Sequence, residues 1–132
     1  MRIWFVCVEN AGRSQIAEGF ARILAPPGAE VSSAGSQPAA ALNPLAVEAM
    51  WEKGIDISRQ NPKSLEALPP GTFDVFVGMG CGDACLATRA KQVITWEIPN
   101  PKGQPIEEVR KIRDMIEEKI RALFNEKGGL TE

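Results

Sequence analysis

Short apolar segments alternate along this chain with longer stretches in which apolar residues recur every three or four positions. β-Branched and aromatic residues are concentrated in the short segments at residues 2–6, 30–33, 73–77 and 92–96, and this composition predicts four buried strands. The second and third segments each follow a Pro-Pro-Gly turn, at residues 26–28 and 69–71.

The stretches between the strands have the spacing of helices that bury one face. The first of these stretches follows the first strand and carries its apolar face at Ile16, Phe20, Ile23 and Leu24. A second helix is expected to begin at Asn43 and Pro44, because asparagine is favoured as a helix cap and proline at the first helical position. Gly54 is expected to close that helix.

The last predicted helix is the longest. Pro105 marks its start, Glu107 and Glu108 suit the positive end of a helix dipole, and Lys119 and Arg121 lie towards its negative end. Its apolar face, which we expect to pack against the core, consists of Ile106, Val109, Ile112, Ile116, Ile120 and Leu123.

Strands that alternate with helices predict an α/β fold, namely a four-stranded parallel sheet flanked by helices on both faces. A chain of 132 residues with 44% apolar residues is sufficient for one core, so a single domain is expected over residues 1–132. In such folds ligands bind beyond the carboxyl ends of the strands.

The charge pattern excludes some classes of partner. The net charge is −2 and both signs are mixed along the chain, which argues against binding of nucleic acid. No apolar run approaches the length of a membrane span, and residues 3–8 are too short for a signal peptide. We therefore expect a cytoplasmic protein that has neither a nucleic-acid nor a membrane partner.

Candidate chemistry lies in the turn that follows the first strand, Cys7-Val8-Glu9-Asn10-Ala11-Gly12-Arg13-Ser14. The backbone N–H groups at a helix N-terminus favour an anion and stabilise a thiolate, so Cys7 is placed as a nucleophile. The planar guanidinium of Arg13 suits two oxygens of a tetrahedral oxyanion such as phosphate or arsenate.

Other residues of this turn fit the same interpretation. Asn10 and Gly12 tolerate the positive φ that a loop needs when consecutive N–H groups face one centre. Ser14 could cap the helix and donate a hydrogen bond to the thiolate. The alternative is a buried structural Cys7 with Arg13 in solvent.

The content of histidine and cysteine narrows the chemistry further. The chain has no histidine, which excludes a Cys–His pair, an imidazole base and a histidine metal ligand. The three cysteines suit a reducing compartment better than a disulfide framework. Cys81 and Cys85 lack the spacing usual in zinc sites, so no metal is expected.

Cys81 and Cys85 follow the third strand in a glycine-flanked segment. Because this strand should run parallel to the first, the segment should open on the same edge as Cys7. If the segment were helical, a separation of four positions would place the two Cα atoms about 6 Å apart, near the upper range for a disulfide. A relay among three thiols is one interpretation, and two unrelated small apolar residues are the other.

The chain resembles the thioredoxin-coupled arsenate reductases, which share the fold of the low-molecular-weight protein tyrosine phosphatases. The resemblance covers nearly the whole chain. Beyond the turn at residues 7–14 it is carried by Gln15-Ile16-Ala17-Glu18-Gly19, Ser33-Ala34-Gly35, Asn43-Pro44, Glu48-Ala49-Met50, Gly54-Ile55-Asp56-Ile57-Ser58, Met79-Gly80-Cys81-Gly82-Asp83-Ala84-Cys85, Trp96 and Asn100-Pro101-Lys102-Gly103.

The resemblance implies a sequence of thiol exchanges. Cys7 would attack the arsenic of arsenate held by the loop and by Arg13, and Cys81 would then attack Cys7, release arsenite and form a Cys7–Cys81 disulfide. Cys85 would next attack Cys81, and thioredoxin or another thiol reductant would reduce the Cys81–Cys85 disulfide. In the best-known members the last two cysteines lie farther apart than they do here.

The resemblance also points to a missing acid. Relatives place an aspartate before the proline that follows the fourth strand, whereas this chain has Asn100 before Pro101. An amide cannot deliver a proton, and a phosphate ester needs one more than arsenate does, so arsenate reduction is favoured over ester hydrolysis. The chain also has no tyrosine to wall a phenol pocket, and Val8 and Glu9 are not aromatic.

Two further positions, Glu18 and Ser33, match residues that help to hold a potassium ion in some relatives.

From the thiols and the missing acid, arsenate reduction is the first hypothesis for function. A weakly active low-molecular-weight phosphatase is the second, and a non-enzymatic oxyanion-binding or redox-sensing domain is the third.

Overall fold

The computed structural model describes residues 1–80 and 90–126. The strands are β1 (Arg2–Cys7), β2 (Glu30–Gly35), β3 (Phe73–Gly78) and β4 (Ala90–Thr95). They pair in parallel in the order β2-β1-β3-β4, which confirms the predicted four-stranded parallel sheet. The helices are α1 (Arg13–Leu24), α2 (Pro44–Trp51) and α3 (Ile106–Glu126), with a short 3₁₀ helix η1 (Leu65–Ala67).

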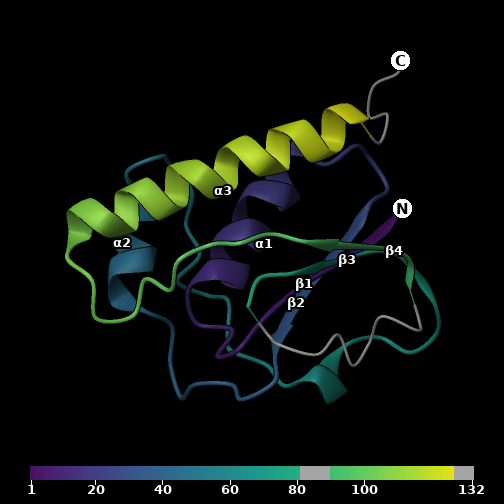
Figure 1. Ribbon diagram of the computed structural model, residues 1–132, viewed down its shortest axis with the longest axis horizontal. Coiled ribbons are helices and arrows are strands. Elements are labelled where there is room, and N and C mark those ends of the chain that lie inside the picture. The colour runs from purple at the N-terminus through teal and green to yellow at the C-terminus, as the bar shows by residue number, and fades with distance from the viewer. Residues whose placement is uncertain (81–89, 127–132) are drawn as a thin grey trace.

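Alternation along β1 divides the core between the two faces of the sheet. Ile3, Phe5 and Cys7 face one cluster, which also contains the buried residues of α1, α2 and α3. Trp4 and Val6 face the opposite cluster, where Leu65 and Leu68 of the η1 region pack on the sheet. Figure 1 shows α3 lying across α1 and α2, and the contacts between these helices agree with that view.

The predicted apolar face of α3 is confirmed, because Val109, Ile112, Ile116, Ile120 and Leu123 are all buried. None of the helices in the described part of the chain is long and apolar enough to cross a membrane.

One expectation about the buried helix faces is wrong. Ile23 is expected on the buried face of α1, yet 60% of it is exposed, because beside the last turn of α1 the neighbouring segments present Lys53 and Glu117, which pair with each other at 3.1 Å.

The expectation that Gly54 closes the second helix is confirmed. Beyond Trp51, the last residue of α2, Gly54 adopts a φ of +78° and its N–H donates to the carbonyl oxygen of Trp51 over 2.8 Å. The N–H of Ile55 donates to the carbonyl oxygen of Met50 over 3.0 Å, which completes a glycine-closed helix end.

Ion pairs on Glu52 join the end of α2 to α3. Arg110 Nη2 lies 2.8 Å from Glu52 Oε2, and Arg113 Nη1 lies 2.8 Å from Glu52 Oε1 while also donating to the carbonyl oxygen of Ala49. The hydrogen bond from Arg110, aided by that from Arg113, lowers the pKa of Glu52 from 4.5 to about 2. These pairs fasten α2, whose first residues border the site described below.

A carboxylate with a lowered pKa stabilises the fold above its unfolded pKa and loses that contribution as the pH falls. We expect Glu52→Gln to lower the melting temperature at neutral pH, and we expect its difference from the native protein to shrink as the pH falls from 4.5 towards about 2. Melting curves across this range measure the effect, with exposed Glu48→Gln on the same helix as the control. A difference that stays constant with pH would contradict the assignment.

Candidate active site

Cys7 is the last residue of β1 and is almost completely buried, at 2% exposure. It pairs in register with Gly35, the last residue of β2, so both lie at the carboxyl edge of the sheet. The chain then turns through residues 8–12 into α1, which begins at Arg13. Cys7 therefore occupies the strand-to-helix turn that the sequence predicted.

The loop after Cys7 is held from outside by the segment that follows β2. Backbone N–H groups of residues 36–43 donate to the carbonyl oxygens of Cys7, Val8, Glu9 and Ala11 over 2.7–3.3 Å. A trans peptide points its N–H away from the preceding carbonyl oxygen. The N–H groups of the same peptides, on Val8, Glu9, Asn10 and Gly12, therefore point away from residues 36–43.

Only one of the two residues expected to adopt a positive φ does so. Asn10 has a φ of 51°, whereas Gly12 has a φ of −129°. Glycine is needed at position 12 for a different reason, since an added Cβ would lie only 2.7 Å from Cγ of Pro101. This close approach brings the segment after β4 against the loop that holds Cys7.

Ser14 is buried and lies 3.0 Å from the sulfur, measured from Oγ to Cys7 Sγ. The contact with the thiol is the one that the sequence suggested. The capping role is wrong, because the N-cap residue of α1 is Gly12 and no side chain caps that end of the helix. Ser14 lies inside the first turn, where its Oγ faces Cys7 Sγ.

Arg13 is 8% exposed and is held between two segments that converge on the site. Its Nη1 donates to the carbonyl oxygen of Ile98 over 3.2 Å. On another side lies Gly80, where an added Cβ would come within 2.6 Å of the same Nη1 atom. Gly80 also has a φ of +90°, a conformation that glycine adopts without strain.

A cavity of about 330 Å³ opens over these residues. Among the residues of the predicted loop, Cys7, Glu9, Ala11, Gly12 and Arg13 line the cavity. The other three, Val8, Asn10 and Ser14, are not among the lining residues, and the last two are buried in the network behind the loop.

The wall opposite the loop comes from α2 and from the segment after β4. Asn43 and Pro44 line the cavity at the start of α2, and Asn100, Pro101 and Lys102 line it beyond β4. Asn100, which the resemblance matches to the acid position of relatives, lines the same cavity as Cys7, and its Oδ1 accepts a hydrogen bond from the N–H of Lys102 over 3.0 Å.

An ion pair that the sequence analysis missed lies at this cavity. Lys102 Nζ is 2.9 Å from Glu9 Oε2, which joins the loop after β1 to the segment after β4. The two residues are separated by 93 positions, so no local pattern could have revealed the pair. The pair balances the negative charge that Glu9 brings to a site suited to anions.

Cys81 and Cys85 lie outside the described residues. The first described range ends at Gly80, which directly precedes Cys81 in the sequence and lies against the guanidinium of Arg13.

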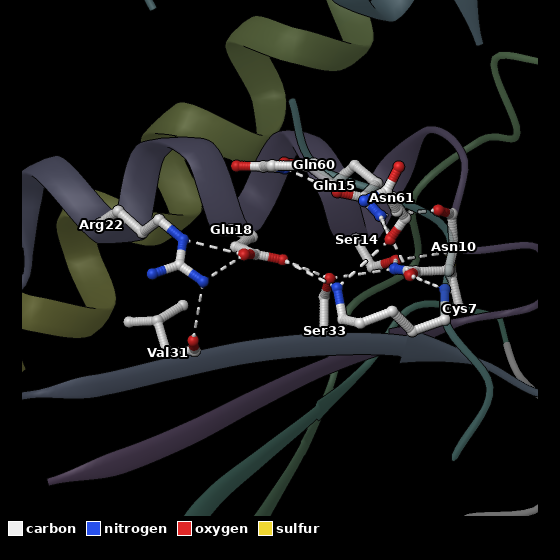
Figure 2. Close-up of polar contacts among 11 residues, drawn as sticks. Cys7, Asn10, Ser14, Gln15, Glu18, Arg22, Val31, Ser33, Gln60 and Asn61 are labelled. Atoms are coloured by element: carbon white, nitrogen blue, oxygen red, sulfur yellow. Dashed lines mark hydrogen bonds and ion pairs between the residues drawn. The ribbon is translucent and has the colours of Figure 1, made fainter. Parts of the chain in front are cut away.

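Glu18 and Ser33, the positions considered for potassium, lie beside cationic side chains of the chain itself. Glu18 is 2% exposed, and its carboxylate accepts a hydrogen bond from Ser33 Oγ. Arg22 donates twice to Glu18 Oε2, at 2.8 and 2.5 Å, as Figure 2 shows. Lys63 Nζ lies 3.8 Å from Glu18 Oε1. Both carboxylate oxygens of Glu18 thus face cationic nitrogen atoms of the chain.

The described ranges 1–80 and 90–126 contain no cluster of three histidine, cysteine, aspartate or glutamate side chains that could hold a metal ion.

Comparison with known proteins gives the family. The model of the low molecular weight phosphotyrosine protein phosphatase family matches residues 2–128. The chain belongs to this family. The resemblance implied this fold, in which a parallel sheet carries Cys7 at the end of β1.

Arsenate reductases are prominent among the similar proteins. The glutaredoxin arsenate reductase of Synechocystis is 34% identical over 126 residues, which cover 93% of this chain and 95% of that protein. A solved arsenate reductase in the phosphate-binding state has a TM-score of 0.85 at 32% identity, and the match covers 95% of this chain and 97% of the other.

A thioredoxin-dependent arsenate reductase of Corynebacterium glutamicum has a TM-score of 0.77 at 36% identity. That match covers 95% of this chain and 60% of the Corynebacterium chain.

Proposed function

We propose that this protein is an arsenate reductase in which Cys7 is the nucleophile and Arg13 holds the oxyanion. The observation that carries the proposal is the composition of one small cavity: Cys7, Arg13 and Asn100 line it together. The first two supply a nucleophile and an oxyanion clamp. The third is an amide at the position where hydrolysis of a phosphate ester would need an acid.

In the first step, Cys7 Sγ attacks the arsenic atom of arsenate and forms a sulfur–arsenic bond. One arsenic–oxygen bond breaks, and the oxygen leaves as water after it takes a proton from solvent. Arg13 and the N–H groups of the loop hold the remaining oxygens and stabilise their charge. Asn100 can donate a hydrogen bond to an oxygen but supplies no proton.

In the second step, a second thiolate attacks the sulfur of Cys7. A disulfide forms, the electron pair of the sulfur–arsenic bond passes to arsenic, and arsenate becomes arsenite with the oxidation of two thiols. We assign the second thiolate to Cys81. Support comes from Gly80, which contacts Arg13 and directly precedes this residue.

In the third step, Cys85 attacks Cys81 and returns Cys7 to its thiol form. A dithiol protein then reduces the Cys81–Cys85 disulfide. We propose thioredoxin for this role, with glutaredoxin as the alternative, since similar proteins carry each of these reductants in their names. This chemistry requires a reducing compartment, such as the cytoplasm.

A single turnover tests the assignment. We expect the reduced protein, mixed with arsenate and no external reductant, to release arsenite and lose two thiols for each arsenite formed. Thiol titration and arsenite measurement give this ratio, and mass spectrometry of peptides locates the disulfide. Cys85→Ser should accumulate a Cys7–Cys81 bridge, whereas Cys7→Ser should form no arsenite.

The other two hypotheses predict different outcomes of the same experiment. A phosphatase would lose no thiols and form no arsenite, but would hydrolyse an aryl phosphate through Cys7. An oxyanion-binding domain would retain arsenate unchanged. Release of arsenite by Cys7→Ser would contradict the assignment of the nucleophile.

The missing acid gives a second prediction. We expect Asn100→Asp to raise the hydrolysis of an aryl phosphate with a poor leaving group by about 10²-fold or more, because a positioned general acid contributes about 10²–10⁴-fold. Arsenate reduction should change much less. The measurement is kcat/KM for both substrates in both proteins.

Asn43→Asp is a matched control for this substitution. It adds the same charge to the same cavity from the start of α2, and its carboxylate can still accept the N–H of Leu45 that Asn43 Oδ1 accepts. Equal gains in both variants would show that position 100 does not act as the acid position.

A further inference from the structure

Gln15 is completely buried in the first turn of α1, and it does not line the cavity. Its Nε2 lies within hydrogen-bond distance of three oxygens: the Asn10 carbonyl at 2.9 Å, Asn10 Oδ1 at 3.0 Å and the Asn61 carbonyl at 3.0 Å. Its Oε1 accepts from Gln60 Nε2 over 2.6 Å. Figure 2 shows Gln15, Gln60 and Asn61 gathered above Ser14 in that view.

Backbone groups fix the orientation of the side-chain amides of Gln15 and Asn10. The carbonyl oxygens of Asn10 and Asn61 can only accept, so the atom of Gln15 that faces them must be its NH₂ group. The N–H of Lys63 can only donate, and it lies 2.8 Å from Asn10 Oδ1. The NH₂ group of Asn10 must therefore face the other way.

That NH₂ group faces two hydroxyl groups. Asn10 Nδ2 donates to Ser14 Oγ over 2.6 Å and to Ser33 Oγ over 3.0 Å. Each serine accepts from Asn10 and keeps its own proton for another partner. Ser33 Oγ donates its hydrogen bond to Glu18, whose ionised carboxylate has no proton to donate.

The remaining acceptor for a hydrogen bond from the Ser14 hydroxyl is Cys7 Sγ, at 3.0 Å. The hydroxyl therefore donates to sulfur, an arrangement that stabilises the thiolate over the thiol. If the amide of Asn10 were reversed, its Oδ1 would accept the hydrogen bond of the Ser14 hydroxyl, and the sulfur would lose this donor.

We propose that Gln15 is a positioning residue for the nucleophile. It holds Asn10 at a positive φ and in one amide orientation, and thereby directs the hydroxyl of Ser14 at Cys7. The proposal rests on the proposed function only in taking Cys7 as the reactive thiol, and its test needs no arsenate.

The test uses protein in which Cys81→Ser and Cys85→Ser leave Cys7 as the sole thiol. Alkylation by iodoacetamide reports the thiolate, and its rate is measured across pH. We expect Gln15→Met to lower the rate at neutral pH about tenfold and to move the pH profile upward by about one unit, because a hydrogen bond to a charged group is lost. Ser14→Ala should have the same effect.

Gln60→Met is the matched control. It makes the same chemical change one contact farther from Asn10 and leaves all the contacts of Gln15 Nε2 in place. We expect it to lower the rate by less than about threefold. Circular dichroism and melting curves show that each variant is folded.

Folded Gln15→Met with the alkylation profile of its parent would overturn the proposal. If Gln15→Met does not fold, Ser14→Ala decides, since an unchanged profile there would show that the hydroxyl does not donate to sulfur. A shifted profile in the sole-thiol protein, combined with failure of the native protein with all three cysteines to form arsenite, would support the positioning role and contradict the proposed function, so the two can fail separately.

Discussion

The side-chain amide of Asn10 is the group on which the rest of the site depends. Asn10 lies in the loop after Cys7 and adopts a positive φ. Its side-chain amide forms hydrogen bonds with residues from α1, β2 and the segment before η1. Because it is completely buried, each of its partners would lose a bond that water could not replace. One amide thus couples the shape of the loop to the state of the thiol.

The fold brings these groups together through the parallel order of its strands. The ends of β1 and β2 lie side by side, and Gly35 is so close to the loop that an added Cβ would lie 2.5 Å from the carbonyl oxygen of Val8. Helix α1 then carries Arg13 towards the cavity and Gln15 behind it. The same turn of helix carries both the residue proposed to hold the oxyanion and the residue that supports the loop.

Much of this arrangement could be predicted from the sequence. The apolar segments located the strands, and Cys7 with Arg13 could be recognised because a strand, a loop and a helix start follow one another locally. Contacts between distant segments could not be predicted. The Glu9–Lys102 pair, the cations around Glu18 and the contact of Gly12 with Pro101 depend on how loops meet in three dimensions. The burial of Glu18 follows from the same packing, and no periodicity indicates it.

The central claim is that the hydroxyl of Ser14 donates to a thiolate at Cys7, and neutron diffraction from crystals of the reduced protein at neutral pH tests it most directly. The account predicts nuclear density for a hydrogen on Ser14 Oγ that points at Cys7 Sγ, with none on the sulfur. It also predicts both hydrogens of Asn10 Nδ2 directed at Ser14 and Ser33. A hydrogen on Cys7 Sγ directed at Ser14 would contradict the account.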